Sequence, residues 1–158
     1  MTSVELTDDY RLLVEQARAL LSGQTHRIAN AANFSALLYQ ALPDLNWAGF
    51  YFLEDGALIV GPFQGKPACV HIPMGKGVCG TAAATRQTQR VADVHAFDGH
   101  IACDPASRSE IVVPLVLSDE VIGVLDIDSP NANRFSAEDQ AGIEALAQVY
   151  LDSIVGQN

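Results

Sequence analysis

The chain has 158 residues, of which 49% are apolar and 18% are charged, so its composition is that of a globular protein with a buried core. A chain of this length typically forms one domain, and we expect residues 1–158 to be a single domain. The formal net charge is −10, from 19 acidic and 9 basic residues, and no cluster of Lys or Arg offers a binding surface for nucleic acid or an anionic membrane.

The N-terminal stretch "MTSVELTDDYRLLVEQ" is acidic. It lacks the basic region and the uninterrupted apolar segment of a signal peptide, and the chain has no run of 18 apolar residues that would predict a membrane-spanning helix. We therefore predict a cytoplasmic protein. An odd number of cysteines, three, also does not suit the disulfide scaffold of a secreted domain.

The first part of the chain predicts two helices. Thr7 is placed to cap a helix over residues 7–21, and Gly23 follows its end. A second helical pattern covers residues 26–41, and Pro43 cannot continue it.

The middle of the chain is dominated by strand patterns. Residues 47–63, "WAGFYFLEDGALIVGPF", predict a β-hairpin that turns at residues 54–56. Residues 68–73 and 88–93 predict two more strands. Between them, "GKGVCGTAAATRQ" at residues 75–87 predicts a short alanine-rich helix.

A long polar loop over residues 94–109 precedes the last elements, and loops of this length commonly bind ligands. Residues 110–129 predict a second hairpin, and Ser136 with Asp139 resembles a capping box that opens a C-terminal helix. Because several strands are adjacent in sequence, the order of elements predicts an α+β fold with helices against an antiparallel sheet, rather than a doubly wound fold.

The three cysteines differ in their settings. Cys103 lies in the polar loop "GHIACDPASRSE" and is expected to be exposed, which makes it a candidate nucleophile. Cys69 ends an apolar run and Cys79 lies at the glycine-rich start of a predicted helix. By composition alone, both are more typical of small buried hydrophobic residues.

A zinc site is the alternative for the cysteines, because His71, His95 and His100 are near them in sequence. The cysteines do not form the close pairs of structural zinc sites, so we predict neither a metal ion nor a cofactor. His100 with Cys103 could still form a thiolate pair, although a histidine in a polar loop is more often simply solvated.

Three acidic residues are placed to converge. Asp126 and Asp128 are two residues apart on one strand, so their side chains leave the same face, and Glu110 begins the partner strand of that hairpin. If this face is exposed, the acids are an ordinary solvated strand end. If it faces inward, their burial requires a cationic ligand or raised pKa values, and the sequence leaves both readings open.

Trp47 and Tyr51 are four residues apart on the first hairpin and therefore share a face. Aromatic residues in such positions are usually part of the core. Beside carboxylates and a cysteine, they would also suit a small amphipathic molecule that carries an ammonium group.

The motifs "WAGFYF", "ACVHIPMGKGVCGTAA", "VADVHAFDGHIACDPASRSEIVVPL" and "GVLDIDSPNANRFSAEDQAGIEALA" together resemble the free methionine-(R)-sulfoxide reductases, a family with the GAF fold. The resemblance runs from Trp47 into the last helix. It implies a six-stranded antiparallel sheet flanked by helices, a homodimer, and a closed pocket for one free amino acid.

The resemblance also implies roles for individual residues. Cys103 stands at the position of the cysteine that attacks the sulfoxide, and Cys69 and Cys79 at those of the resolving cysteines. The positions of the substrate-binding carboxylates and of the aromatic wall are occupied by Glu110, Asp126, Asp128, Trp47 and Tyr51.

The implied chemistry requires an acid as well as a thiolate, because the oxygen of the sulfoxide must be protonated. Glu110 or Asp128 is the candidate acid, and Asp126 is the candidate partner of the substrate's ammonium group. The resulting sulfenic acid on Cys103 would condense with a second thiol, and thioredoxin is the expected reductant of the disulfide. The rival interpretation is a GAF module that binds a small ligand or senses oxidant without turnover.

Overall fold

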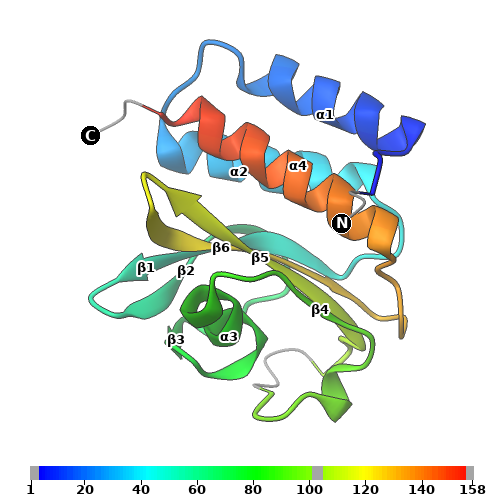
Figure 1. The fold of residues 1–158 in the computed structure, drawn as a ribbon, viewed down its shortest axis with the longest axis vertical. Coiled ribbons are helices and arrows are strands. Elements are labelled where there is room, and N and C mark those ends of the chain that lie inside the picture. The colour runs from blue at the N-terminus through cyan, green and yellow to red at the C-terminus, as the bar shows by residue number, and fades with distance from the viewer. Residues whose placement is uncertain (1–3, 101–104, 156–158) are drawn as a thin grey trace.

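The computed structural model describes residues 4–100 and 105–155. These residues form one antiparallel sheet and four α-helices (Figure 1). The sheet order is β3-β2-β1-β6-β5-β4, and every neighbouring pair is antiparallel. The strands are β1 (Trp47–Glu54), β2 (Ala57–Gly65), β3 (His71–Pro73), β4 (Gln89–Val91), β5 (Ser109–Leu117) and β6 (Glu120–Ser129). The predicted α+β fold with six antiparallel strands is confirmed.

Three helices lie on one side of the sheet, and one covers the opposite face (Figure 1). On the first side, α1 (Asp8–Leu21) packs on α2 (Arg27–Ala41) and α4 (Ala137–Ser153), and these two helices contact the sheet. The opposite face carries α3 (Gly77–Thr85), which packs on a smaller apolar cluster. The large core between the three helices and the sheet includes Phe34, Phe50 and Tyr150, none of which is exposed.

The predicted helix starts are confirmed by their caps. The Thr7 side chain accepts a hydrogen bond from the Tyr10 backbone N–H at the start of α1. Ser136 and Asp139 form a reciprocal capping box at the start of α4. The Asp139 carboxylate also accepts a hydrogen bond of 2.6 Å from the Tyr10 hydroxyl, so the same residue ties α1 to α4.

Two predicted strands are shorter than expected. The patterns at residues 68–73 and 88–93 predicted longer strands, whereas β3 and β4 have three residues each. Both are edge strands with one neighbour, so fewer backbone groups can pair. The predicted loop at 94–109 begins with a 3₁₀ turn, η1 (Val94–Ala96).

Within the described residues, no helix combines the length and the apolar character needed to span a bilayer.

Candidate functional site

The register of the sheet brings the predicted aromatic and acidic residues onto one face. Trp47 on β1 lies opposite Asp128 on β6, and Asp128 lies opposite Glu110 on β5. In the next same-facing row, Asp126 pairs with Gly49. Because alternate residues of a strand share a face, Asp126 and Asp128 both project to the side that carries α3.

This face is buried at the site, which decides the question that the sequence left open. Glu110 is 7% exposed and Asp126 is 5% exposed. Glu110 and Asp126 are therefore not a solvated strand end, and Asp128 beside them is half-buried. Their burial on an inner face demands protonation or a positive partner.

An aromatic wall adjoins the acids on β1 and β2. The rings of Trp47 and Tyr51 stack with centroids 5.8 Å apart, and the ring of Phe63 also stacks on Trp47, with centroids 5.0 Å apart. Phe63 was missed at the sequence level. It faces Gly49 through a β-bulge in the hairpin, and a Cβ on Gly49 would lie 2.2 Å from the Phe63 Cβ.

The polar atoms of the aromatic wall hold the segment that carries Cys69. The Trp47 indole Nε1–H donates to the Lys66 backbone carbonyl at 3.1 Å. The Tyr51 hydroxyl donates to the Cys69 backbone carbonyl at 2.9 Å. Trp47 and Tyr51 thus both line the site and position the neighbouring chain.

The cysteines fall in three different situations. Cys79 on α3 is a buried free thiol, as the sequence predicted for it. Cys69 is only half-buried and is engaged in a disulfide, so it is not the buried hydrophobic residue that composition alone favoured. The predicted nucleophile Cys103 lies outside the described residues.

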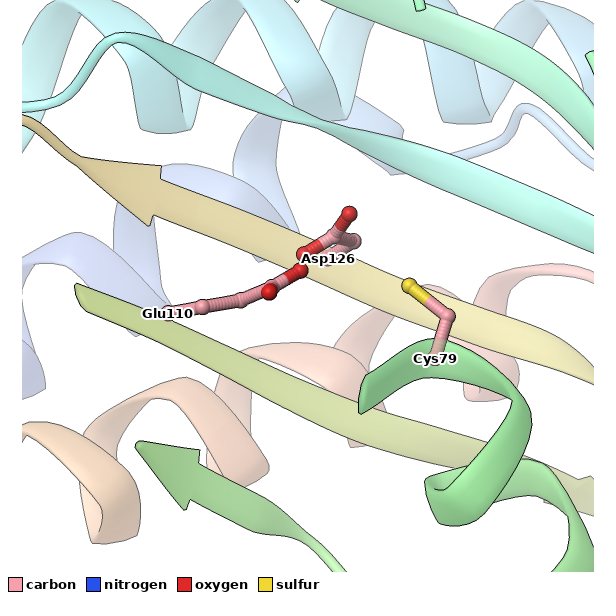
Figure 2. Close-up of side chains that lie close together, drawn as sticks. All are labelled: Cys79, Glu110 and Asp126. Carbon is pink, nitrogen blue, oxygen red and sulfur yellow. The ribbon is translucent and has the colours of Figure 1, made fainter. Parts of the chain in front are cut away.

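Cys79 meets two of the acids (Figure 2). One ligand atom from each of Cys79, Glu110 and Asp126 lies within 4.8 Å of the other two, and all three residues are buried. They come from α3, β5 and β6. His71 and His95, which the sequence had placed near the cysteines, are exposed.

A narrow cavity of about 50 Å³ lies at this junction. The aromatic wall bounds one side and the acids another, while α3 and the chain around Ala68 and Ser107 close it. His100, half-buried, also reaches the cavity. The lining residues are Trp47, Tyr51, Pro67, Ala68, Ile72, Gly77, Val78, Cys79, His100, Ser107, Glu110, Asp126 and Asp128.

Burial dominates the electrostatics of the cavity. Desolvation, followed by the charges of Asp126 and Asp128, raises the pKa of Glu110 well above its ordinary value. Desolvation also raises the pKa of Asp126, but hydrogen bonds from Glu110 and Cys79 oppose this rise. The arrangement corresponds to a protonated Glu110 that donates to an Asp126 carboxylate.

The same environment keeps the Cys79 thiol neutral. Desolvation, followed by the neighbouring carboxylates, raises the pKa of Cys79 well above that of an ordinary thiol. A thiol of this kind is a poor nucleophile because little thiolate forms. Burial and then His95 lower the pKa of His100, so its neutral form is favoured.

Comparisons with known proteins identify the family to which this chain belongs. A family model described as a GAF domain matches residues 17–153. The free methionine-R-sulfoxide reductase of Escherichia coli (strain K12) is 59% identical over 140 residues, which cover 89% of this chain and 85% of the relative. This chain belongs to the free methionine-R-sulfoxide reductase family of GAF-domain proteins.

Two solved structures are similar to this chain. The fRMsr of Staphylococcus aureus, in complex with substrate, is 52% identical with a TM-score of 0.90, and the match covers 98% of this chain and 100% of that chain. A Burkholderia vietnamiensis protein described as a GAF sensor is 64% identical with a TM-score of 0.89, and 92% of each chain is covered. The family resemblance seen in the sequence motifs is thereby confirmed, while the roles of individual residues stay predictions.

Replacing Glu110 by Gln should change how stability depends on pH. A carboxyl group whose pKa is raised by folding stabilises the fold below its ordinary pKa, and this contribution is lost as pH rises toward the raised value. Relative to Glu110→Gln, the wild type should therefore lose up to about 1.4 kcal/mol of unfolding free energy per pH unit above roughly pH 4.3. Urea unfolding of the reduced proteins at a series of pH values measures this difference.

The matched control is Glu54→Gln, which alters an exposed carboxyl on β1. Its stability curve should run parallel to that of the wild type. If the stability curve of Glu110→Gln is also parallel to that of the wild type, folding does not raise the pKa of Glu110.

Proposed function

We propose that this protein reduces free L-methionine-(R)-sulfoxide to L-methionine. The observation that carries the proposal is the pair of buried acids, Glu110 and Asp126, beside an aromatic wall in a cavity of small size. Such a pocket suits a small ligand with a cationic end and an apolar end. The name of the Escherichia coli relative and the substrate complex of the Staphylococcus aureus relative favour the same substrate.

Asp126 is proposed to bind the ammonium group of the substrate. Its Oδ1 atom is buried and has no hydrogen-bond partner among the described residues. A buried acceptor of this kind is costly unless a donor meets it, and an ammonium group supplies both a donor and a positive charge. The methyl end of the substrate then packs against Trp47.

Glu110 is the acid that we favour for protonating the sulfoxide oxygen. The sequence left Glu110 and Asp128 as equal candidates, and the raised pKa of Glu110 favours Glu110. A carboxylic acid that keeps its proton near neutral pH can donate it as charge develops on the oxygen. Asp128 on β6 lies directly opposite Glu110, and its negative charge favours the protonated form of Glu110.

Cys103 is proposed as the nucleophile. Its thiolate attacks the electrophilic sulfur and forms a sulfur–sulfur bond, while Glu110 supplies a proton to the oxygen. The resulting hydroxyl group moves from the substrate sulfur to the Cys103 sulfur, and methionine leaves with the electron pair of the sulfur–sulfur bond. Cys103 is then a sulfenic acid. A second thiol condenses with it, which forms a disulfide and releases water.

Cys69 is proposed as the first resolving cysteine. It is half-buried, engaged in a disulfide, and held by the hydrogen bond from Tyr51 to its backbone carbonyl. The neutral, buried thiol of Cys79 is less suited to attack a sulfenic acid, because thiolate is the reactive form. An external dithiol, which we take to be thioredoxin, then reduces the disulfide.

The remaining predictions from the resemblance extend this proposal. We propose that residues 1–158 act as a single GAF domain, in the cytoplasm, as a homodimer, in defence against oxidative stress. The competing function is a sensor module, which the Burkholderia vietnamiensis relative favours by its description. Turnover of free methionine sulfoxide with an excess of dithiol separates the two, because a sensor would release at most one methionine per chain.

Cys103→Ser should abolish methionine release. A serine hydroxyl is almost entirely protonated at neutral pH and cannot replace the thiolate. The measurement is a single-turnover reaction of the reduced protein with free methionine-(R)-sulfoxide. Cys69→Ser is the matched control and should release one methionine per chain at the wild-type rate, then recycle slowly. Full methionine release by Cys103→Ser would exclude this mechanism.

A substrate without the ammonium group should be rejected. An unpaired buried carboxylate costs roughly 3–5 kcal/mol, and each 1.4 kcal/mol is tenfold, so kcat/KM should fall by at least about two orders of magnitude. The comparison uses free L-methionine-(R)-sulfoxide, its N-acetyl derivative, and the deamino analogue, which removes the charge without adding bulk. Asp126→Asn should reduce the difference in kcat/KM between the free substrate and the two compounds that lack the ammonium group. Equal kcat/KM for all three compounds would show that the acids do not select the substrate.

Tyr51→Phe should slow recycling while sparing the first turnover. The ring of the aromatic wall stays, but the hydrogen bond to the Cys69 carbonyl is lost, and a bond of about 1 kcal/mol corresponds to roughly a fivefold effect. The rate of disulfide formation is measured by labelling the remaining free thiols in samples quenched at successive times. Tyr150→Phe is the control, since it removes a 2.9 Å hydrogen bond to the Arg27 carbonyl on the opposite face. If Tyr51→Phe and Tyr150→Phe slow disulfide formation equally, the Tyr51 hydroxyl does not position Cys69.

A further inference from the structure

The thiol of Cys79 and the carboxylates of Glu110 and Asp126 point toward one another (Figure 2). Their ligand atoms lie within 4.8 Å of one another, and all three residues are buried. We propose that these side chains also form a binding site for a divalent cation of borderline softness, of which Zn²⁺ is the type. The proposal concerns binding alone and does not depend on the reductase activity.

Asp126 gives a second reason for a cation at this place. Asp126 is only 5% exposed, and its Oδ1 atom is buried without a hydrogen-bond partner among the described residues. An acceptor in that condition has a lone pair available for a ligand that enters the cavity. The cavity of about 50 Å³ has room for an ion with its remaining water ligands.

The charge balance of the cavity also favours a cation. Neither Lys nor Arg lies among its described lining residues, and His100 favours its neutral form. The acids therefore share protons instead of meeting a positive charge. A divalent cation would replace those protons, and a coordinating thiol loses its proton outright.

The mixed donor set selects the kind of metal. Zn²⁺ accepts cysteine sulfur at about 2.3 Å and carboxylate oxygen at about 2.0–2.2 Å, so the thiol and both carboxyl groups are ligands that it uses. Ca²⁺ and Mg²⁺ prefer oxygen ligands throughout and gain little from a thiolate. A bound ion would occupy the position proposed for the substrate's ammonium group, so inhibition of turnover by the ion rests on the proposed function while the binding itself does not.

The test uses the full chain with Cys69→Ser and Cys103→Ser, so that Cys79 is its one remaining thiol. Cd²⁺ is the probe, because thiolate coordination gives an ultraviolet charge-transfer band. The band should saturate at one equivalent, be displaced by Zn²⁺, and disappear when Cys79→Ser is added. Glu110→Gln and Asp126→Asn should each weaken Cd²⁺ binding at least tenfold, and the exposed control Glu54→Gln should leave it unchanged.

Proton release gives a readout that needs no carboxylate variant. In the parent double variant at about pH 6, Cd²⁺ binding should release more than one proton, since the Cys79 thiol and at least one carboxyl group must both ionise. The proposal is overturned if no charge-transfer band forms, if only the single proton of the thiol is released, or if folded Glu110→Gln and Asp126→Asn proteins bind Cd²⁺ as the parent does.

Discussion

Two carboxyl groups buried against each other on the inner face of the sheet constrain the rest of this site. Glu110 and Asp126 are almost fully excluded from solvent, and their neighbours include Asp128 and the Cys79 thiol. Like charges in a medium of low dielectric constant cannot all ionise without a counter-charge. One group therefore keeps a proton, Cys79 stays neutral, and the cavity favours a ligand that brings positive charge.

The fold supports this costly arrangement from its other face. β1, β5 and β6, which carry the acids and most of the aromatic wall, are internal strands with a neighbour on each side. Beneath them lies the large apolar core formed with α1, α2 and α4. A rigid sheet held from behind can present buried acids at fixed positions, because the apolar burial offsets the cost of the polar site.

The aromatic wall links binding to the chemistry of the cysteines. Trp47 and Tyr51 form the wall with their rings and hold the backbone at Lys66 and Cys69 with their polar atoms. In the proposed reaction, the surface that packs the substrate thus also fixes the place of the resolving thiol. The same convergence of a thiol with two acids underlies the proposed cation site.

The sequence by itself determined the local structure and which residues share a face. Period, caps and turn residues predicted the four helices and both hairpins, because these features depend on near neighbours: Thr7 caps α1, and Ser136 with Asp139 opens α4. Only the tertiary structure decided that the acids face inward, since strand alternation is the same whichever face α3 covers. It also decided the place of Phe63, because a β-bulge between Gly49 and Tyr51 shifts the hairpin register by one residue. Only the tertiary structure brings Cys79 and Asp126 together, because their contact joins α3 to β6, and sequence spacing carries no information about how a helix docks on a sheet.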